Sequence, residues 1–268
     1  MAPDGLRLFR RAWLPERPTR ALLLVHGYAE HSGRYEEMGA WFAARGAAVH
    51  AYDHRGHGRS GGPRCHVARF EEFLDDLAAV LASVRAQHPD LPLTLVGHSM
   101  GALITLAFLA ERQPPIASAV TSGAALSLGA ISPVRVALAR ALRRVLPRLS
   151  LGSGLDPQGL SRDPEVVRRY LEDPLVHRTM TASLGAELLA AASRTAARAG
   201  QVGVPLLMLH GAADPLCAAE GTRSFHAGLG SAGRALRIYP ELRHEIFNEP
   251  ERETVWQDVL TWLEERST

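Results

Sequence analysis

The feature that most constrains the fold is a regular alternation of short apolar runs with longer helical patterns. The runs are apolar at nearly every position, which is typical of strands buried on both faces of a parallel sheet. Helical spacing fills 34–46, 69–89 and the residues after 99, with Gly or Pro at the ends. We therefore predict an α/β fold, a mostly parallel sheet with helices on both faces. The predicted strands are 21–26, 47–52, 93–97, 116–122, 205–211 and 235–240.

The alternation is interrupted once, between residues 126 and 199. This stretch has helical and Pro-interrupted segments but no convincing strand, so we expect a helical lid insertion above the sheet. A chain of 268 residues that is 46% hydrophobic can bury one large core. We predict one core domain from 1–125 and 200–268, interrupted by a lid insertion over 126–199.

Composition excludes several functions. The net charge is only +2, and all 30 basic residues are Arg, which does not indicate a nucleic-acid partner. The two cysteines, Cys65 and Cys217, lack metal-type spacing and predict reduced thiols in a cytoplasmic protein. No metal site is expected from His54, His57 and His66, which have no carboxylate at ligand spacing. The first twenty residues are broken by Arg, Pro and Glu, so neither an export signal nor a spanning helix is expected.

A serine lies at a predicted junction between a strand and a helix. In "LTLVGHSMGALITLAFLA" (93–110), Ser99 is central to a G-x-S-x-G pattern between two apolar runs. Such a turn holds a serine at the carboxyl end of a strand, where parallel sheets bind ligands, and points helix amides at the reacting oxygen. The pattern alone is weak, because "GRSGG" around Ser60 also matches it. Ser60 is not followed by a helix, so we predict Ser99 as the nucleophile.

A serine needs a base and an acid before it can attack an ester. Asp214 follows the predicted strand 205–211, and His244 follows the strand 235–240, which is the chain order expected in this fold. All three positions therefore converge at one end of the sheet. The alternatives are a surface aspartate and a salt-bridging histidine. Glu241 and Glu245 are the substitutes for the acid, but they adjoin His244 and have no loop of their own.

A tetrahedral intermediate needs two N–H donors for its oxyanion. The backbone amide of Met100, directly after the predicted nucleophile, is one candidate. The amide of Tyr28, placed by the turn at Gly27, is the other. This chemistry requires no cofactor.

Several motifs in order resemble the monoacylglycerol lipase and lysophospholipase-like family of α/β-hydrolases. They are "HGYAEHSGRY", "YDHRGHGRSGG", "LVGHSMGA", "LPRLSLGSGLDPQGLSRDPEVVRRYLEDPLVH", "LLMLHGAADPLC" and "RHEIFNEP". The resemblance implies the α/β-hydrolase fold, a lid over an acyl-chain tunnel, and hydrolysis of monoacylglycerols to glycerol and fatty acid through an acyl-enzyme. It also implies substrate-binding positions at Glu30, Arg34, His98 and Tyr170.

The sequence departs from this family at two adjacent positions. The family often has a smaller residue where this chain has Tyr28, and Gly where it has Ala29. The main-chain donor is unaffected, but the shape of the alcohol pocket is in question. Lysophospholipase and general carboxylesterase activity stay open, as does a non-catalytic binding protein on a hydrolase scaffold.

The lid insertion also predicts a partner surface. Apolar residues recur at helical spacing across 131–150, with arginines largely on other faces, and no acidic residue occurs between Glu111 and Asp156. A basic amphipathic helix can lie on an anionic lipid surface, here the inner membrane surface. A helix whose apolar face packs on the core fits the pattern equally well. The sequence does not indicate an oligomeric state. The apolar series is Ile131, Val134, Leu138, Leu142, Val145 and Leu149.

Overall fold

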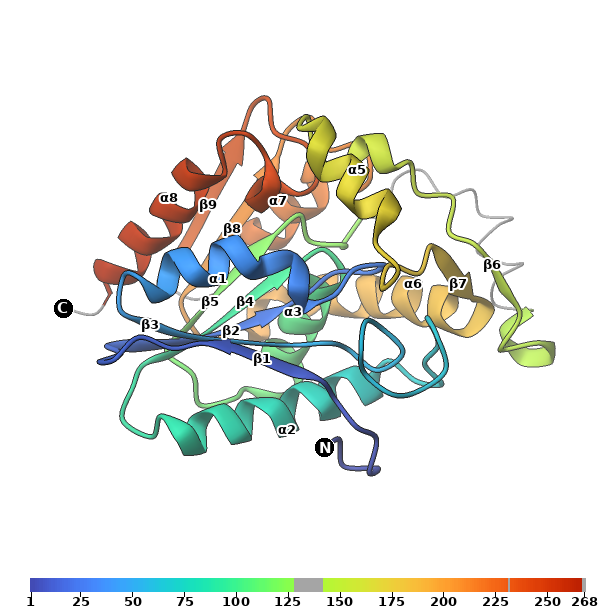
Figure 1. Cartoon of the computed structure of the whole chain (residues 1–268), viewed down its shortest axis with the longest axis horizontal. Coiled ribbons are helices and arrows are strands. Elements are labelled where there is room, and N and C mark those ends of the chain that lie inside the picture. Colours follow the sequence, from blue (N-terminus) through green and yellow to red (C-terminus); the bar gives the residue numbers. More distant parts are fainter. Residues whose placement is uncertain (128–141, 231, 267–268) are drawn as a thin grey trace.

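A seven-stranded sheet forms the centre of the computed structural model, which describes residues 1–127, 142–230 and 232–266 (Figure 1). The strand order is β1-β3-β2-β4-β5-β8-β9, and every neighbouring pair is parallel except β1 and β3. The strands are β1 (Arg10–Trp13), β2 (Arg20–Val25), β3 (Ala47–Tyr52), β4 (Leu93–His98), β5 (Ser118–Ser122), β8 (Leu206–Gly211) and β9 (Arg234–Tyr239).

The six predicted strands all form, and each boundary lies within two residues of its predicted position. The strands β2, β3, β4, β5 and β8 are buried at almost every position, as a sheet covered on both sides requires. The same prediction is wrong for β9, whose residues are half-buried or exposed because it forms an edge of the sheet. The edge strand β1 was not predicted. Its four residues, Arg-Arg-Ala-Trp, are half-buried or exposed and carry no apolar run that would indicate a strand.

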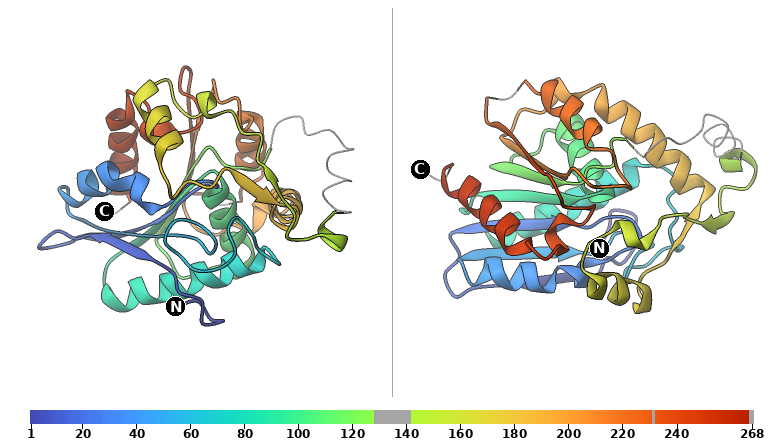
Figure 2. Two further views of the ribbon diagram at one scale, coloured as in Figure 1. Left: turned by 45° about the vertical axis from the view of Figure 1, so that its right-hand side comes forward. Right: turned by 90° about the horizontal axis from the view of Figure 1, so that it is seen from above.

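Helices cover both faces of the sheet and bury two apolar clusters (Figure 2). On one face α1 and α8 contribute Phe42 and Trp256, while on the other α2 and α3 contribute Phe73 and Leu103. The sheet therefore separates two cores and fixes the ends of its strands in space. The helices are α1 (Glu36–Ala43), α2 (Glu71–Gln87), α3 (Met100–Arg112), α6 (Ala182–Ala196), α7 (Ala219–Ala227) and α8 (Arg252–Glu264). Short 3₁₀ helices are η1 (Ser32–Tyr35), η2 (Pro157–Gly159), η3 (Ala199–Gln201) and η4 (Ile246–Asn248).

The segment between β5 and β8 contains a small ribbon as well as helices. Strands β6 (Ser150–Gly152) and β7 (Thr179–Thr181) pair antiparallel next to the start of α6 at one side of the molecule, and the same segment contains α5 (Pro164–Glu172) (Figure 1). The prediction that residues 126–199 contain no strand is therefore wrong. Each strand has only three residues, which is too short for an alternating pattern to be recognised. The apolar residues Leu184 and Leu188 of α6 join the same core cluster as α3.

The predictions of an amphipathic lid helix and of no membrane-spanning helix can be compared with the structure only for the described residues. The amphipathic series in the lid insertion begins at Ile131, and 128–141 lie outside the described residues. Its later members can be assessed, because residues 142–145 are helical and Val145 is 76% exposed. Among the described helices, none combines the length and apolar character needed to cross a bilayer.

Candidate active site

Ser99 lies on the sharp turn between β4 and α3. Its φ of 52° and ψ of −116° are unfavourable for a side chain with a Cβ, which is typical of strain held at a functional turn. The two pattern glycines permit the turn. A Cβ at Gly97 would lie 2.6 Å from the carbonyl oxygen of Gly101, and one at Gly101 would lie 2.0 Å from the carbonyl oxygen of Val25. The G-x-S-x-G spacing is thus a steric requirement of this junction.

The serine of the competing pattern has a structural role. The hydroxyl of Ser60 is buried, donates to the carbonyl oxygen of Asp53 at 2.6 Å, and accepts from the N–H of Phe9 at 2.8 Å. These bonds fasten the loop after β3 to the N-terminal segment. Ser60 is therefore not available as a nucleophile.

His244 and Asp214 meet Ser99 at the same end of the sheet. The Nε2 atom of His244 lies 2.9 Å from the Ser99 hydroxyl oxygen, and its Nδ1 lies 2.7 Å from Asp214 Oδ2. The three residues come from the ends of β4, β8 and β9, whose parallel pairing aligns them. This geometry is that of a nucleophile, a base and a base-orienting acid.

Burial and hydrogen bonds set the charges of this group. Burial raises the pKa of Asp214, but hydrogen bonds from His210 and His244 outweigh it and hold that pKa well below its ordinary value. Burial lowers the pKa of His244, but the hydrogen bond and charge of Asp214 outweigh it, so the net shift is upward. Asp214 is thus ionised at neutral pH, and a carboxylate at this position favours the protonated form of the His244 imidazole.

A second histidine, His210, contacts the Asp214 carboxylate and was not predicted from the sequence. It lies in β8 with no exposed surface, and its Nε2 is 3.0 Å from Asp214 Oδ2. The N–H groups of Leu216 and Cys217 donate to Oδ1 of the same carboxylate. The only available signal was its position four residues before Asp214, which by itself is uninformative.

The loop after β2 packs against Ser99. A Cβ at Gly27 would lie 3.1 Å from the Ser99 Cβ, so this loop passes directly against the nucleophile. Among the backbone hydrogen bonds of the described residues, none is donated by the N–H of Tyr28 or of Met100. The next residue, Ala29, has a φ of 55°, which explains why a glycine suits this position.

Glu30 and Arg34 form a buried network with Glu245. The Arg34 guanidinium donates to both carboxylate oxygens of Glu245, at 2.5 and 2.8 Å, and to Glu30 Oε2 at 3.3 Å. Glu30 Oε1 accepts from the Gly27 N–H and, at 2.8 Å, from the hydroxyl of Tyr35. Burial opposes ionisation of Glu245, but Arg34 overcomes it and lowers that pKa to about 2. The network links the loop after β2 to the residue after His244.

The other two predicted substrate positions flank this network. Burial and the neighbouring His244 lower the pKa of His98 to about 3, so its imidazole is neutral, and the two rings are 4.8 Å apart. Tyr170, from α5, is buried with its ring 5.0 Å from the Arg34 guanidinium carbon. All four predicted positions therefore lie near the serine group or the Arg34 network, although Glu30 and Arg34 already bind protein atoms.

The segment between β5 and β8 contacts His244 through its backbone. The N–H groups of His244 and Glu245 donate to the carbonyl oxygens of Gly159 and Leu160, at 3.4 and 2.8 Å. A Cβ at Gly159 would lie 2.7 Å from a ring carbon of Pro215, next to the acid. Residues 159–160 thus fit between the loops that carry the acid and the base.

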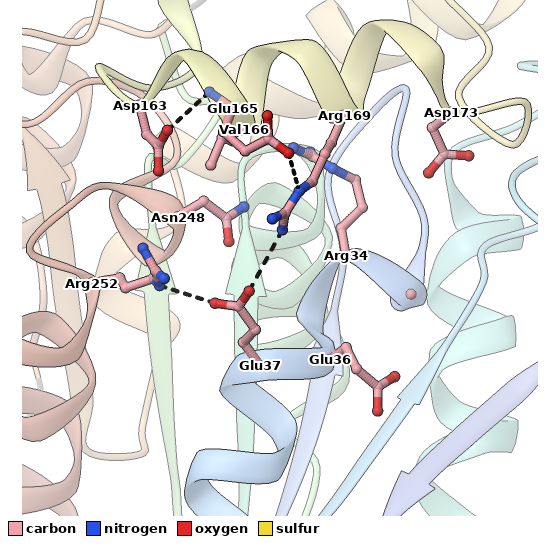
Figure 3. A pocket seen from close by; sticks show the side chains of 11 residues that line it. Arg34, Glu36, Glu37, Asp163, Glu165, Val166, Arg169, Asp173, Asn248 and Arg252 are labelled. Atoms are coloured by element: carbon pink, nitrogen blue, oxygen red, sulfur yellow. Dashed lines mark hydrogen bonds and ion pairs between the residues drawn. The ribbon is translucent and has the colours of Figure 1, made fainter.

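A charged cavity of about 230 Å³ lies on the outer side of Arg34 (Figure 3). It is bounded by α5, α1 and the start of α8, and Glu37 pairs there with Arg169 and Arg252. Of the described residues, neither Ser99 nor His244 lines it. Arg34 therefore lines this cavity and also contacts Glu245, the residue after His244.

Comparison with known proteins agrees with this geometry. The sequence profile of the family described as serine aminopeptidase, S33, matches residues 16–251. Monoacylglycerol lipase from Mycolicibacterium smegmatis is 39% identical, with 97% of this chain and 93% of that protein aligned. The chain belongs to the monoacylglycerol lipase family of α/β-hydrolases. Human monoglyceride lipase is 36% identical over 98% of this chain and 89% of its own length.

A solved member of the monoacylglycerol lipase family has the same architecture. The crystal structure of the Paleococcus ferrophilus monoacylglycerol lipase superposes with a TM-score of 0.88 at 34% identity, covering 97% of this chain and 99% of that one. The predicted α/β-hydrolase fold and the family resemblance are thereby confirmed. Membership of the family makes the chain a carboxylic ester hydrolase.

Proposed function

We propose that this protein hydrolyses monoacylglycerols to glycerol and fatty acid, with Ser99 as nucleophile, His244 as general base and Asp214 as the orienting acid. The single observation that carries the proposal is the continuous hydrogen-bonded series from Asp214 Oδ2 through both nitrogens of His244 to the Ser99 hydroxyl. The named activities of the relatives, monoacylglycerol and monoglyceride lipases, support the substrate class.

The mechanism follows from this geometry. His244 Nε2 takes the hydroxyl proton as Ser99 Oγ attacks the ester carbonyl carbon, and the carbonyl oxygen becomes an oxyanion. The N–H groups of Tyr28 and Met100 stabilise that oxygen. The imidazolium then gives its proton to the leaving glycerol oxygen, and an acyl-enzyme forms. In the second half, water attacks the acyl carbon while His244 again removes and returns a proton.

The residues around Arg34 support a small polyol as the alcohol part of the ester substrate. Because Arg34 is held by Glu245 and Glu30, its guanidinium is fixed in place next to the residue that follows His244, with its charge balanced by theirs. His98, neutral and next to His244, can accept or donate a hydrogen bond. These groups, with Tyr170, favour a small polyol as the leaving group, which fits glycerol.

The decisive test compares wild-type protein with Ser99→Ala. We expect the substitution to lower monoacylglycerol turnover by roughly 10⁴ to 10⁶ and to abolish labelling by a fluorophosphonate. Ser60→Ala removes the competing pattern and serves as the matched control, since its folded fraction should still be labelled. Near-normal turnover by Ser99→Ala would refute the assignment, as would labelling that survives in it.

A substrate panel separates the remaining alternatives. Monooleoylglycerol, trioleoylglycerol, oleoyl lysophosphatidylcholine and a water-soluble ester would be compared on the purified protein. We expect the highest kcat/KM for the monoacylglycerol. A higher value for the lysophospholipid would assign a lysophospholipase, and equal values for all small esters would assign a general carboxylesterase.

We also propose that the lid insertion contacts a lipid surface. Next to Arg144 and Arg148, the apolar side chains of Val145, Leu146 and Leu151 are 76%, 52% and 55% exposed. The described part of the amphipathic stretch therefore does not bury its apolar residues on the core. Exposed leucine and valine beside arginine favour an anionic bilayer.

Liposome sedimentation tests this contact. We expect wild-type protein to sediment with vesicles that contain phosphatidylglycerol, and a variant with both Val145→Asp and Leu146→Asp to stay in the supernatant. Leu14→Asp is the control, because Leu14 is 59% exposed beyond β1, on the opposite side of the molecule from β6 (Figure 1). Equal sedimentation of the double variant would contradict a contact through the lid insertion.

A further inference from the structure

Asp214 has a second imidazole partner that the serine mechanism does not use. His210 Nε2 lies 3.0 Å from Asp214 Oδ2, the same oxygen that His244 binds, and 3.0 Å from the carbonyl oxygen of Cys217. Its Nδ1 lies 2.7 Å from the hydroxyl oxygen of Thr222 in α7. His210 and Thr222 have no exposed surface. A hydrogen-bonded series therefore runs from Thr222 through His210, Asp214 and His244 to the serine.

The partners of His210 fix its tautomer. An ionised carboxylate and a carbonyl oxygen can only accept, so Nε2 must carry the proton that faces them. In the neutral imidazole Nδ1 is then an acceptor, and the hydroxyl of Thr222 must donate to it. Thr222 thus holds the ring in the form that can donate to Asp214. Removing that hydroxyl would leave the buried Nδ1 acceptor without a partner and the ring less firmly oriented towards Asp214.

We propose that His210 is a positioning residue for the reaction, which holds the Asp214 carboxylate in line with His244 and shares the negative charge of Oδ2. This inference rests on the proposed function. Because Oδ2 contacts both His210 and His244, it stabilises a positive charge on His244 less than it would with His244 as its only partner. Without His210, the carboxylate would attract the His244 imidazolium more strongly while being held less firmly in place.

The other charged or titratable neighbours of these rings stay constant in the test. Around His210 they are Asp214 and the buried Cys217 thiol. Around His244 they are Asp214, the His98 ring, Glu245 and Glu30, the last two held by Arg34. Because no variant below changes any of them, a shift in the pH profile reports the loss of the His210 donor.

The experiment uses His210→Leu, which removes the donor, and His210→Gln, whose side-chain amide can restore one near the Nε2 position. Activity on p-nitrophenyl butyrate would be measured from pH 5 to 9 and normalised to active sites titrated with a fluorophosphonate. For His210→Leu we expect kcat to fall about tenfold at little change in KM, because a hydrogen bond to a charged group is lost. The acidic limb of kcat/KM should move upward by about half a pH unit. His210→Gln should recover most of both effects.

Thr222→Val and Thr222→Ser test the same series from its far end. Thr222→Val should reproduce part of the His210→Leu effect, and Thr222→Ser should behave as wild type. The inference is overturned if His210→Leu matches wild type per titrated site, if Leu and Gln at 210 behave alike, or if the acidic limb does not move. A simple ester keeps the two proposals distinguishable, since a failure on monoacylglycerol alone would leave these results in place.

Discussion

Replacing Arg34 by Met isolates the energetics of the buried network beside His244. The Arg34 and Glu245 side chains are only 9% and 4% exposed, and their contact is bidentate. Arg34→Met keeps an unbranched side chain of similar length but leaves the carboxylates of Glu245 and Glu30 without their counter-charge. Breaking one side of such a buried pair costs about 3 to 5 kcal/mol.

The expected loss is large for a protein of this size. At about 2 to 4 °C per kcal/mol, Arg34→Met should lower Tm by about 6 to 20 °C. Urea unfolding followed by circular dichroism at pH 7.5 measures the free energy directly. The double variant Arg34→Met with Glu245→Leu removes both charges, so it should recover most of the loss, because a well-packed apolar pair is often as stable as a buried ion pair.

The pH dependence provides an internal check. The folded-state pKa of Glu245 is lowered to about 2 from its ordinary value of 4.5, so its stabilising contribution is present above pH 4.5 and is lost as pH falls through 2. The penalty of Arg34→Met should therefore be smaller at pH 3.5 than at pH 7.5. A penalty below about 1 kcal/mol at pH 7.5, typical of surface pairs, would refute this reasoning. The reasoning would also be refuted if the double variant Arg34→Met with Glu245→Leu were no more stable than Arg34→Met alone.

Three further outcomes follow from individual residues. Because the net pKa shift of His244 is upward and the base acts when neutral, the acidic limb of kcat/KM should lie above pH 6.5; a limb at or below this value would contradict the Asp214 contact. Ala29→Gly should raise the free energy of unfolding by about 0.5 to 1 kcal/mol, because the φ of 55° at this position is strained for alanine. Chemical denaturation measures this free energy, and a lower value for the variant would contradict the reasoning. Burial raises the pKa of the Cys65 thiol to about 11, and Cys217 is also buried, so neither should react with Ellman's reagent before unfolding; rapid native-state labelling would be the contrary result.

The sequence indicates the strands and the serine turn well because one physical requirement acts on many adjacent residues. A strand buried on both faces must be apolar throughout, and a turn with φ of 52° needs glycine on both sides of Ser99. Asp214 could be located because it closely follows the buried strand β8, and His244 because it follows β9, an edge strand whose residues are half-buried or exposed. Parallel pairing then brings them together.

The parts that were missed depend on contacts between distant residues. His210 is one polar residue in an apolar run, and its role follows only from Asp214 and Thr222, which lie on separate elements. Arg34 pairs with Glu245 across 211 positions of the chain, a contact that no local pattern encodes. The strands β6 and β7 stabilise each other and are individually too short to recognise.

The carbonyl groups of Gly159 and Leu160 have a consequence for protein engineering. Since they accept the N–H groups of His244 and Glu245, any segment exchanged into this position must follow the same backbone path at residues 159–160. A chimera would have to keep glycine at position 159, because Pro215 leaves no room there for a larger residue. Specificity can be redesigned more freely in the exposed β6–β7 ribbon than at residues 159–160.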